Sequence, residues 1–265
     1  MDLELSGKGC LVTGASRGIG LATGRALCAE GAGVLLCGRD REAVEGAATE
    51  CGRAGGRAEA IAADVTEAGA GERLAAVCEQ RLGSLDVLVN NAGTSAVQPL
   101  DQLEDDDWRE QWELHVMAPL RLMRAAAPRM AERGEGRIVN VCSSSGKRPS
   151  LTNAAYSVTK AAQLSLSRVF ADAYAARGVL VNAVAPGPVE TPLWTAEGGL
   201  ADQMAATQGI SREEVLETST SKIPLGRFGR DDEVAAVIAF LCSARASNVS
   251  GAAWSVDGGA VPIIL

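Results

Sequence analysis

Two residues in the middle of the chain have the side-chain types and the spacing for proton transfer to or from a small molecule. Tyr156 and Lys160 are four residues apart at the start of an expected helix, so their side chains share one face of it. A free tyrosine has a pKa of about 10 and donates protons poorly at neutral pH. A neighbouring ammonium lowers that pKa, which makes the phenol a usable acid or base. Taken alone, however, this spacing is common and usually structural.

Ser143 is a third candidate for the same chemistry. It follows the expected strand 137–142 and precedes Tyr156 by thirteen residues. Strand ends and helix starts meet at the carboxyl edge of a parallel sheet, so Ser143 is expected to hydrogen-bond a carbonyl that Tyr156 protonates. Ser144 and Ser145 offer the same group, and the alternative for all three is a turn. We expect that alternative for two of the three.

A glycine-rich segment near the N-terminus is suited to phosphates. Thr13-Gly-Ala-Ser-Arg-Gly-Ile-Gly20 follows the first strand and opens the first helix. Gly14 permits a tight turn, Gly18 lets a pyrophosphate approach the backbone, and Gly20 allows close helix packing. The helix start adds unpaired N–H groups and a favourable dipole. Turns also collect glycine, but the strand–turn–helix context favours a dinucleotide site.

The expected elements place these residues at one edge of a sheet. Continuous apolar runs, typical of strands covered on both faces, alternate with longer helical segments. This order predicts an α/β fold with a parallel sheet and helices on both faces. The expected strands are 9–13, 34–37, 86–90, 137–142, 179–184 and 252–256. The expected helices are 18–30, 40–54, 67–82, 105–132, 154–177 and 231–243.

The connection from Pro186 to Arg230 is longer than the others and contains a short helical piece near 211–218. Long excursions within compact domains are often lids over a binding site. This one follows a strand's carboxyl end, where ligands bind in open α/β sheets. We therefore expect a substrate lid over about residues 188–228; the alternative is a surface insertion.

Composition excludes several classes of protein. The 265 residues are 47% hydrophobic, enough for one sizeable core, and 22% charged. A net charge of −8 disfavours nucleic-acid and anionic-membrane partners. The seven cysteines form no CxxC pair, so neither a disulfide framework nor a metal site is expected. Without a signal peptide or an apolar run of about 20 residues, the expected location is the cytoplasm.

Together these patterns resemble the short-chain dehydrogenase/reductase family over nearly the whole chain, particularly its 3-oxoacyl-carrier-protein reductases and ketoreductases. In this order and spacing, the combination is far more specific than any one part. The resemblance implies one Rossmann domain over 1–265, with a doubly wound, seven-stranded parallel sheet, that binds NAD(H) or NADP(H). The matching parts are the TGxxxGxG loop (13–20), Asp64-Val65, Asn90-Asn-Ala-Gly93, Ser143, Tyr156-x-x-x-Lys160, Pro186-Gly187 and Thr191.

The resemblance also implies residue roles. Tyr156 would be the general acid for carbonyl reduction or the base for alcohol oxidation, and Lys160 would lower its pKa and hydrogen-bond the nicotinamide ribose. Ser143 would orient the carbonyl and stabilise developing negative charge. The cofactor would supply the hydride. Its expected contacts are Gly14, Ser16, Arg17, Gly18, Ile19, Gly20, Gly38, Arg39, Asp64, Val65, Asn91, Ala92, Gly93, Tyr156, Lys160, Pro186, Gly187, Val189 and Thr191.

One position departs from the family pattern. Members commonly carry an asparagine in the helix after the NNAG segment, where it supports a water that relays protons to the lysine. The corresponding segment here, 108–117, contains His115, the only histidine of the chain. With an ordinary pKa of about 6.5, the imidazole could hold that water or join the relay. The alternative is a tolerated replacement whose main-chain carbonyl keeps the water site.

The end of the second strand predicts NADP(H) over NAD(H). Selectivity for NAD requires a carboxylate there for the ribose 2′-hydroxyl, but this sequence has Gly38 followed by Arg39. The guanidinium of Arg39 suits a 2′-phosphate, and Arg17 is expected to approach from the other side. Asp40 should instead cap the following helix. Because cells usually keep the NADP(H) pool reduced, ketone reduction is the expected direction.

The substrate is less constrained. Leu193 and Trp194 of the expected lid, with Cys142 and Ser145 opposite, are the expected contacts, and Val97, Leu100 and Leu103 are expected beside Cys142. A 3-oxoacyl or polyketide substrate on an acyl carrier protein would need a basic patch. Its candidates otherwise lie on a solvated or subunit-facing helix side: Arg121, Arg124, Arg129 and Arg133. A non-catalytic nucleotide-binding regulator is disfavoured by the intact Ser143, Tyr156 and Lys160.

The resemblance also predicts assembly. Relatives use helices equivalent to 105–132 and 154–177 as a four-helix subunit interface. The apolar end 260–265 would otherwise expose large aliphatic side chains at a terminus. We expect a homotetramer, with a dimer as the alternative, whose C-termini pack across subunits.

Overall fold

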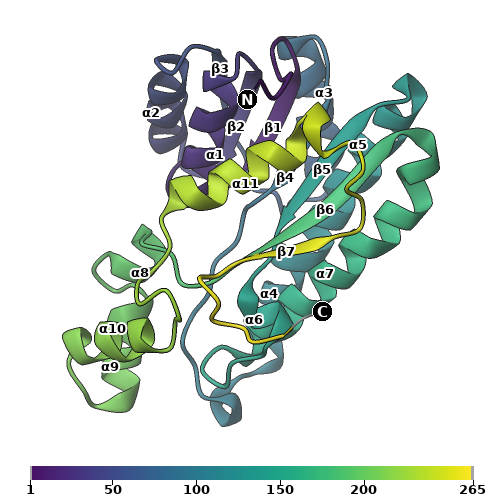
Figure 1. Cartoon of the computed structure of the whole chain (residues 1–265). Coiled ribbons are helices and arrows are strands. Elements are labelled where there is room, and N and C mark those ends of the chain that lie inside the picture. The colour runs from purple at the N-terminus through teal and green to yellow at the C-terminus, as the bar shows by residue number, and fades with distance from the viewer. Residues whose placement is uncertain (1, 264–265) are drawn as a thin grey trace.

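Seven parallel strands form one sheet in the order β3-β2-β1-β4-β5-β6-β7 (Figure 1). The structure is a computed structural model, and it describes residues 2–263. The sheet confirms the predicted doubly wound Rossmann architecture. Its strands are β1 (Gly9–Thr13), β2 (Gly33–Gly38), β3 (Arg57–Ala62), β4 (Val87–Asn90), β5 (Gly136–Val141), β6 (Val179–Pro186) and β7 (Ala253–Val256).

Helices cover both faces of this sheet. Alternate side chains of β1 show why its sequence is a continuous apolar run: Cys10 and Val12 pack into the core beside α1, α2 and α11, whereas Leu11 faces α3, α5 and α7. The longer helices are α1 (Gly18–Ala29), α2 (Arg41–Gly52), α3 (Ala70–Leu82), α4 (Asp105–Trp112), α5 (Ala118–Arg133), α7 (Ala154–Tyr174) and α11 (Asp231–Cys242).

The direction of strand addition reverses beside β1. The chain adds β2 and β3 on one side of β1, then returns to place β4 on its other side. The loops that follow β1 and β4 therefore leave the sheet in opposite directions and open a crevice at its carboxyl edge. Crevices at such switch points are where open α/β sheets bind ligands.

Two elements differ from the sequence prediction. Strand β3 was not anticipated, because Arg57 and Glu59 interrupt an alanine-rich run that lies half-buried at the sheet edge. The expected helix 105–132 is interrupted by a π-helix at Glu113–Met117. Pro119 has no N–H to return to the carbonyl of His115 four residues earlier, and this missing hydrogen bond coincides with the wider π-helical turn.

The 188–228 segment contains more helix than predicted. Helices α8 (Pro192–Thr195), α9 (Leu200–Gln208) and α10 (Arg212–Ser221) lie together at one end of the molecule (Figure 1). A capping box starts α10, since Ser211 Oγ accepts from Glu214 N at 3.1 Å and a Glu214 carboxylate oxygen accepts from Ser211 N at 2.8 Å. The segment is therefore a small folded layer.

All seven cysteines are buried as free thiols. Burial raises the pKa of most of them, for example to about 12 at Cys78, Cys142 and Cys242. Within residues 2–263, no helix combines the length and hydrophobicity needed to span a bilayer. The predicted packing of the C-terminus concerns residues 264 and 265 in part, and those two lie outside the described residues.

Candidate active site

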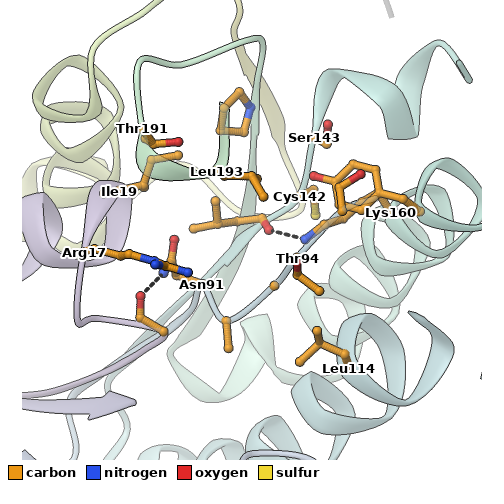
Figure 2. Close-up of a pocket in the computed structure, with 18 of the residues that line it drawn as sticks. Arg17, Ile19, Asn91, Thr94, Leu114, Cys142, Ser143, Lys160, Thr191 and Leu193 are labelled. Atoms are coloured by element: carbon orange, nitrogen blue, oxygen red, sulfur yellow. Dashed lines mark hydrogen bonds between the residues drawn. The ribbon is translucent and has the colours of Figure 1, made fainter. Parts of the chain in front are cut away.

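A cavity of about 580 Å³ lies at the carboxyl edge of the sheet and collects nearly all the predicted residues (Figure 2). Gly20 and His115 are predicted site residues that do not border it. Val97, Leu100 and Leu103 were also expected there but do not line it, and Leu100 points to solvent with 56% of its surface exposed. The predicted residues that line it are Gly14, Ser16, Arg17, Gly18, Ile19, Gly38, Arg39, Asp64, Val65, Asn91, Ala92, Gly93, Cys142, Ser143, Ser145, Tyr156, Lys160, Pro186, Gly187, Val189, Thr191, Leu193 and Trp194.

The glycines of the loop after β1 are required by space. A Cβ on Gly14 would come within 2.7 Å of the Ala92 Cα, and one on Gly20 within 2.3 Å of the Gly14 carbonyl oxygen. The loop after β4 is tied to this turn, because Asn91 Nδ2 donates to the carbonyl oxygens of Thr13 and Gly14, each at 2.9 Å. Backbone from two strands thus forms a close-fitting cradle.

The first turn of α1 leaves its N–H groups available. Arg17 occupies the N-cap position but makes no capping hydrogen bond, and the first turn holds no acidic side chain. An uncapped helix start with nearby positive charge is an anion site. Together with the glycine cradle, this geometry fits the pyrophosphate of a dinucleotide.

The end of β2 carries positive charge. Asp40 turns away to cap α2, where its carboxylate accepts from Ala43 N at 3.0 Å, as predicted. Within residues 2–263, the guanidinium groups of Arg17 and Arg39 have neither a hydrogen bond nor an ion pair. Asp64 is bound by Thr66, and this bond, with the charge of Arg39, holds the pKa of Asp64 below its usual value.

Ser143 and Tyr156 meet at the other side of the cavity. Burial raises the pKa of Tyr156 to about 12, against a hydrogen bond with Ser143 that lowers it. The Ser143 hydroxyl also accepts from Ser145 N at 3.1 Å. The phenol therefore carries its proton at neutral pH and lies beside a second hydroxyl, an arrangement suited to protonating a bound carbonyl.

Lys160 is buried one helical turn beyond Tyr156. Its Nζ donates to the carbonyl oxygen of Val141 at 2.9 Å and to Gln163 Oε1 at 3.0 Å, and lies 5.6 Å from the centre of the Tyr156 ring (Figure 2). Burial lowers the pKa of Lys160 to about 8. The expected lowering of the Tyr156 pKa by this ammonium is not seen, because burial of the phenol dominates.

His115 is fully buried within the π-helix and packs edge-on against the Tyr156 ring, with ring centres 5.2 Å apart. Its Nε2 accepts from Thr94 N at 3.3 Å. Its Nδ1 lies 3.1 Å from Thr159 Oγ1, and this hydroxyl donates to the Tyr156 carbonyl oxygen at 2.9 Å, so Nδ1 carries the ring proton. Burial and the charge of Lys160 hold the pKa of His115 well below its usual value. Because the ring is neutral and both of its nitrogens are hydrogen-bonded, His115 connects Thr94, in the loop after β4, to Thr159 on α7.

Sequence reasoning missed several residues that complete the site. Asn153 and Gln163 precede Tyr156 and follow Lys160 by three residues, so helical spacing could have placed them on the same face of α7. Thr94 and Thr159 carry no comparable signal, because they reach the site through strand order and tertiary packing, whereas Leu200 was among the apolar residues expected in the lid. Ser95 also borders the cavity and is 6% exposed.

The basic patch considered for a carrier protein is largely neutralised. Arg121 pairs with Glu113, Arg129 with Glu72 at 2.8 Å, and Arg133 with Glu79 at 3.5 Å. Within residues 2–263, Arg124 alone of the four has no such partner. These pairs hold α5 against its neighbours and leave little free positive charge on that face.

Known proteins share this fold, site and sequence. A family model described as short chain dehydrogenase matches residues 8–199. The 3-oxoacyl-[acyl-carrier-protein] reductase of Thermotoga maritima is 34% identical over 98% of this chain and 100% of that protein. Gluconate 5-dehydrogenase of Gluconobacter oxydans is 35% identical over 97% of this chain and 95% of that protein. L-sorbose reductase of Gluconobacter frateurii, solved with NADPH and L-sorbose, has a TM-score of 0.92 and 33% identity, with 100% of both chains covered.

The chain therefore belongs to the short-chain dehydrogenase/reductase family. It is an oxidoreductase with an NAD(P)-binding Rossmann fold, and its substrate is a small molecule.

Proposed function

We propose that the protein is an NADPH-dependent carbonyl reductase that converts a ketone to a secondary alcohol, with Tyr156 as the general acid. The observation that carries this proposal is the meeting of the Ser143 and Tyr156 hydroxyls in the cavity that also holds the glycine cradle. A regulator that only binds a nucleotide has no need of two hydroxyls placed around one ligand oxygen.

The chain's own groups account for the proton chemistry. When bound, NADPH supplies the hydride. Ser143 hydrogen-bonds the ketone oxygen, orients it and stabilises the negative charge that develops there. Tyr156, protonated at neutral pH because burial raises its pKa to about 12, donates its proton to the same oxygen. Lys160 holds positive charge beside this pair up to its pKa of about 8.

The preference for NADPH over NADH rests on charge at the end of β2. Gly38 supplies no carboxylate to accept from a ribose 2′-hydroxyl, and the guanidinium groups of Arg39 and Arg17, which have no hydrogen bond or ion pair within residues 2–263, can bind a 2′-phosphate. Two such contacts favour the phosphorylated cofactor by roughly 1–3 kcal/mol. The bound NADPH of the similar L-sorbose reductase is in keeping with this preference.

A 3-oxoacyl-carrier-protein reductase is the second candidate, because the Thermotoga maritima relative has that name. The paired arginines of α5 weigh against it, since a carrier protein would find little free positive charge on that helix. A simple ketone therefore fits the described residues better than an acyl group on a protein.

The proposal includes a substrate lid over about residues 188–228 and a homotetramer. Leu193, Trp194 and Leu200 of that segment border the cavity, as a lid over the substrate would.

An apolar hollow on α5 and α7, beside Val169 with 59% of its surface exposed, supports subunit contact through these helices. Sedimentation at micromolar concentration tests the assembly, and a fully active monomer would contradict it.

The decisive experiment is NADPH oxidation with a panel of ketones. Tyr156→Phe should lower kcat at least 1,000-fold while NADPH still binds, because only the proton donor is removed. Tyr174→Phe is the matched control, since Tyr174 is the other tyrosine of the chain and lies at the far end of α7. Tight NADPH binding without turnover on any ketone, in wild type and Tyr156→Phe alike, would instead indicate a regulator.

A further inference from the structure

Residues on one face of α7 line the cavity in sequence, from the proposed cofactor side to the proposed substrate side. Asn153, Tyr156 and Lys160 are three and four residues apart, so they share one face of the helix. Lys160 lies on the side proposed for the cofactor ribose, and Tyr156 is the proposed proton donor. Asn153 lies one turn before Tyr156, about 5 Å along the helix axis. It therefore occupies the part of the cavity where the rest of a substrate would extend.

Asn153 does not use its side chain as expected at a helix start. It occupies the N-cap position of α7, where asparagine normally accepts from a backbone N–H, but it makes no capping bond. Its Oδ1 instead accepts from the buried Ser157 hydroxyl at 3.0 Å. This bond fixes the orientation of the amide and turns its donor end, Nδ2, toward Ser95 Oγ, 3.4 Å away.

The Asn153–Ser95 pair has hydrogen-bond donors that no acceptor within residues 2–263 satisfies. Ser95 is 6% exposed, and within residues 2–263 its hydroxyl accepts from Asn153 but has no acceptor for its own proton. Nδ2 of Asn153 has a second proton without an acceptor among the same residues. A donor that is closed off from water without a partner is costly, and this applies to the buried Ser95 most directly. Both residues border the cavity, so a ligand oxygen can satisfy them.

Charge at this end of the cavity restricts the ligand further. Among the lining residues that the structure describes, the cations are Arg17, Arg39 and Lys160. The two arginines lie at the adenosine end, and Lys160 is held by Val141 and Gln163. The 188–228 segment lines the cavity mainly with apolar side chains, Leu193, Trp194 and Leu200 among them. A carboxylate or phosphate placed there would lose its water without gaining a counter-ion.

We propose that Asn153 and Ser95 select an uncharged ketone that carries a hydroxyl group next to its carbonyl, such as a ketose or a smaller hydroxyketone. This inference rests on the proposed function and specifies its substrate. The pair donates to the hydroxyl oxygen while Ser143 and Tyr156 hold the ketone oxygen. Of the three relatives compared above, the reductase solved with neutral L-sorbose has the substrate closest to this description.

Three methyl ketones that differ in one group test the proposal directly. Hydroxyacetone has the hydroxyl, butan-2-one replaces it with a methyl group, and acetoacetate replaces it with a carboxylate. We expect kcat/KM for hydroxyacetone to exceed the other two by at least ten-fold, and L-sorbose to be a better substrate than 5-keto-D-gluconate. Equal or higher values for butan-2-one or acetoacetate would overturn the inference.

Variants of Asn153 and Ser95 test whether this pair causes the preference for hydroxyacetone. Asn153→Leu and Ser95→Ala should each lower kcat/KM for hydroxyacetone, mainly through KM, about ten-fold more than they lower it for butan-2-one. Ser221→Ala, on the exposed side of α10, is the control for a lost hydroxyl. An unchanged hydroxyacetone preference in both variants, with NADPH affinity intact, would also overturn the inference. Ketone reduction that survives Tyr156→Phe would instead contradict the proposed function itself.

Discussion

The loop after β1 and the 188–228 segment border the same cavity, but different forces hold them. A Cβ on Gly14 or Gly20 would meet backbone atoms at 2.7 Å or less, whereas a Cβ on Gly198 or Gly209 would meet nothing within 4 Å. The first region is fixed by contacts between backbone atoms, so Gly14 and Gly20 leave no room for a side chain. At Gly198 and Gly209, glycine is needed only for its own positive φ.

The connections of the two regions show the same contrast. Asn91 ties the loops after β1 and β4 together through two backbone oxygens. The 188–228 segment is held mainly to itself: Asp202 pairs with Arg212 at 2.9 Å, and Arg212 also binds the Thr195 carbonyl oxygen. Gln203 connects it to the core by accepting from Val97 N at 2.9 Å. The proposed cofactor side is preformed, and the proposed substrate side is a separately braced layer that docks on it.

The largest contrast should come from adding one methyl group to each region. Gly20→Ala is expected to lower NADPH affinity more than 100-fold, because the new Cβ displaces the backbone of the cradle. Gly209→Ala should cost only about 1–2 kcal/mol of stability for its left-handed backbone, with kinetics unchanged. Fluorescence titration with NADPH and thermal unfolding measure the two effects. Equal losses of affinity would remove the contrast.

Exchanging charge at the end of β2 should affect only the cofactor side. A Cβ on Gly38 would lie 3.4 Å from the Val44 side chain, an ordinary contact, so Gly38→Asp can be accommodated. Gly38→Asp with Arg39→Ala should lower the preference for NADPH over NADH by roughly ten- to a hundred-fold. The KM for the ketone should stay constant in steady-state kinetics with both cofactors. A wild type that already prefers NADH would refute the assignment.

His115 joins the two sides, since it bridges the loop after β4 to α7. His115→Ala should lower kcat about ten-fold with NADPH affinity retained, because the Thr94 and Thr159 contacts that set the Tyr156 ring are lost. The loss should be the same from pH 6 to 9, as the ring is neutral throughout. A loss confined to one limb of the pH profile would favour a proton relay. His115→Asn tests whether the common residue restores the rate.

The pH profile of ketone reduction should report Lys160. Below its pKa of about 8 the ammonium is charged and stabilises the negative charge that develops at the ketone oxygen during reduction, so kcat/KM should fall as the pH rises through about 8. Gln163→Glu would place a carboxylate at an oxygen now 3.0 Å from Nζ. The midpoint should then move up by about one pH unit or more, whereas Gln163→Met should not raise it. If the midpoint does not move in Gln163→Glu, the pH profile does not report the titration of Lys160.

The smallest effect on kinetics is expected at the contact between the 188–228 segment and the loop after β4. Gln203→Leu removes the acceptor for Val97 N and should raise the KM for the ketone about three-fold, which corresponds to less than 1 kcal/mol. NADPH affinity should not change. Initial rates at saturating NADPH measure the first value, and an equal change in NADPH affinity would show that the layer also shapes the cofactor site.

The sequence predicts what depends on local pattern. The strands with apolar runs, the glycine loop and the Tyr156–Lys160 spacing are all visible from neighbouring residues. Strand β3 is not, because an edge strand needs no continuous apolar run and Glu59 can remain in solvent. Helix α9 lacks a strong start signal: Gly199 precedes it, and its side-chain pattern is weakly amphipathic.

Partners that meet through the fold cannot be predicted in this way. The His115 bridge joins residues 21 and 44 positions away, and its neutral state follows from burial that only tertiary packing creates. The pairing of the α5 arginines likewise depends on acids contributed by α3. By contrast, helical spacing from Tyr156 could have indicated Asn153, although not its partner Ser95.

The burial of all seven thiols makes this protein a convenient subject for optical measurements. Because inaccessible cysteines react slowly with maleimides, a single cysteine introduced on the surface would be labelled selectively without removing the native ones. Ser221→Cys on α10, paired with a second new cysteine on the exposed side of α2, would place a donor dye on the 188–228 segment and an acceptor dye on the helix that follows β2. Energy transfer between them would then follow the docking of the 188–228 segment in an otherwise unmodified chain.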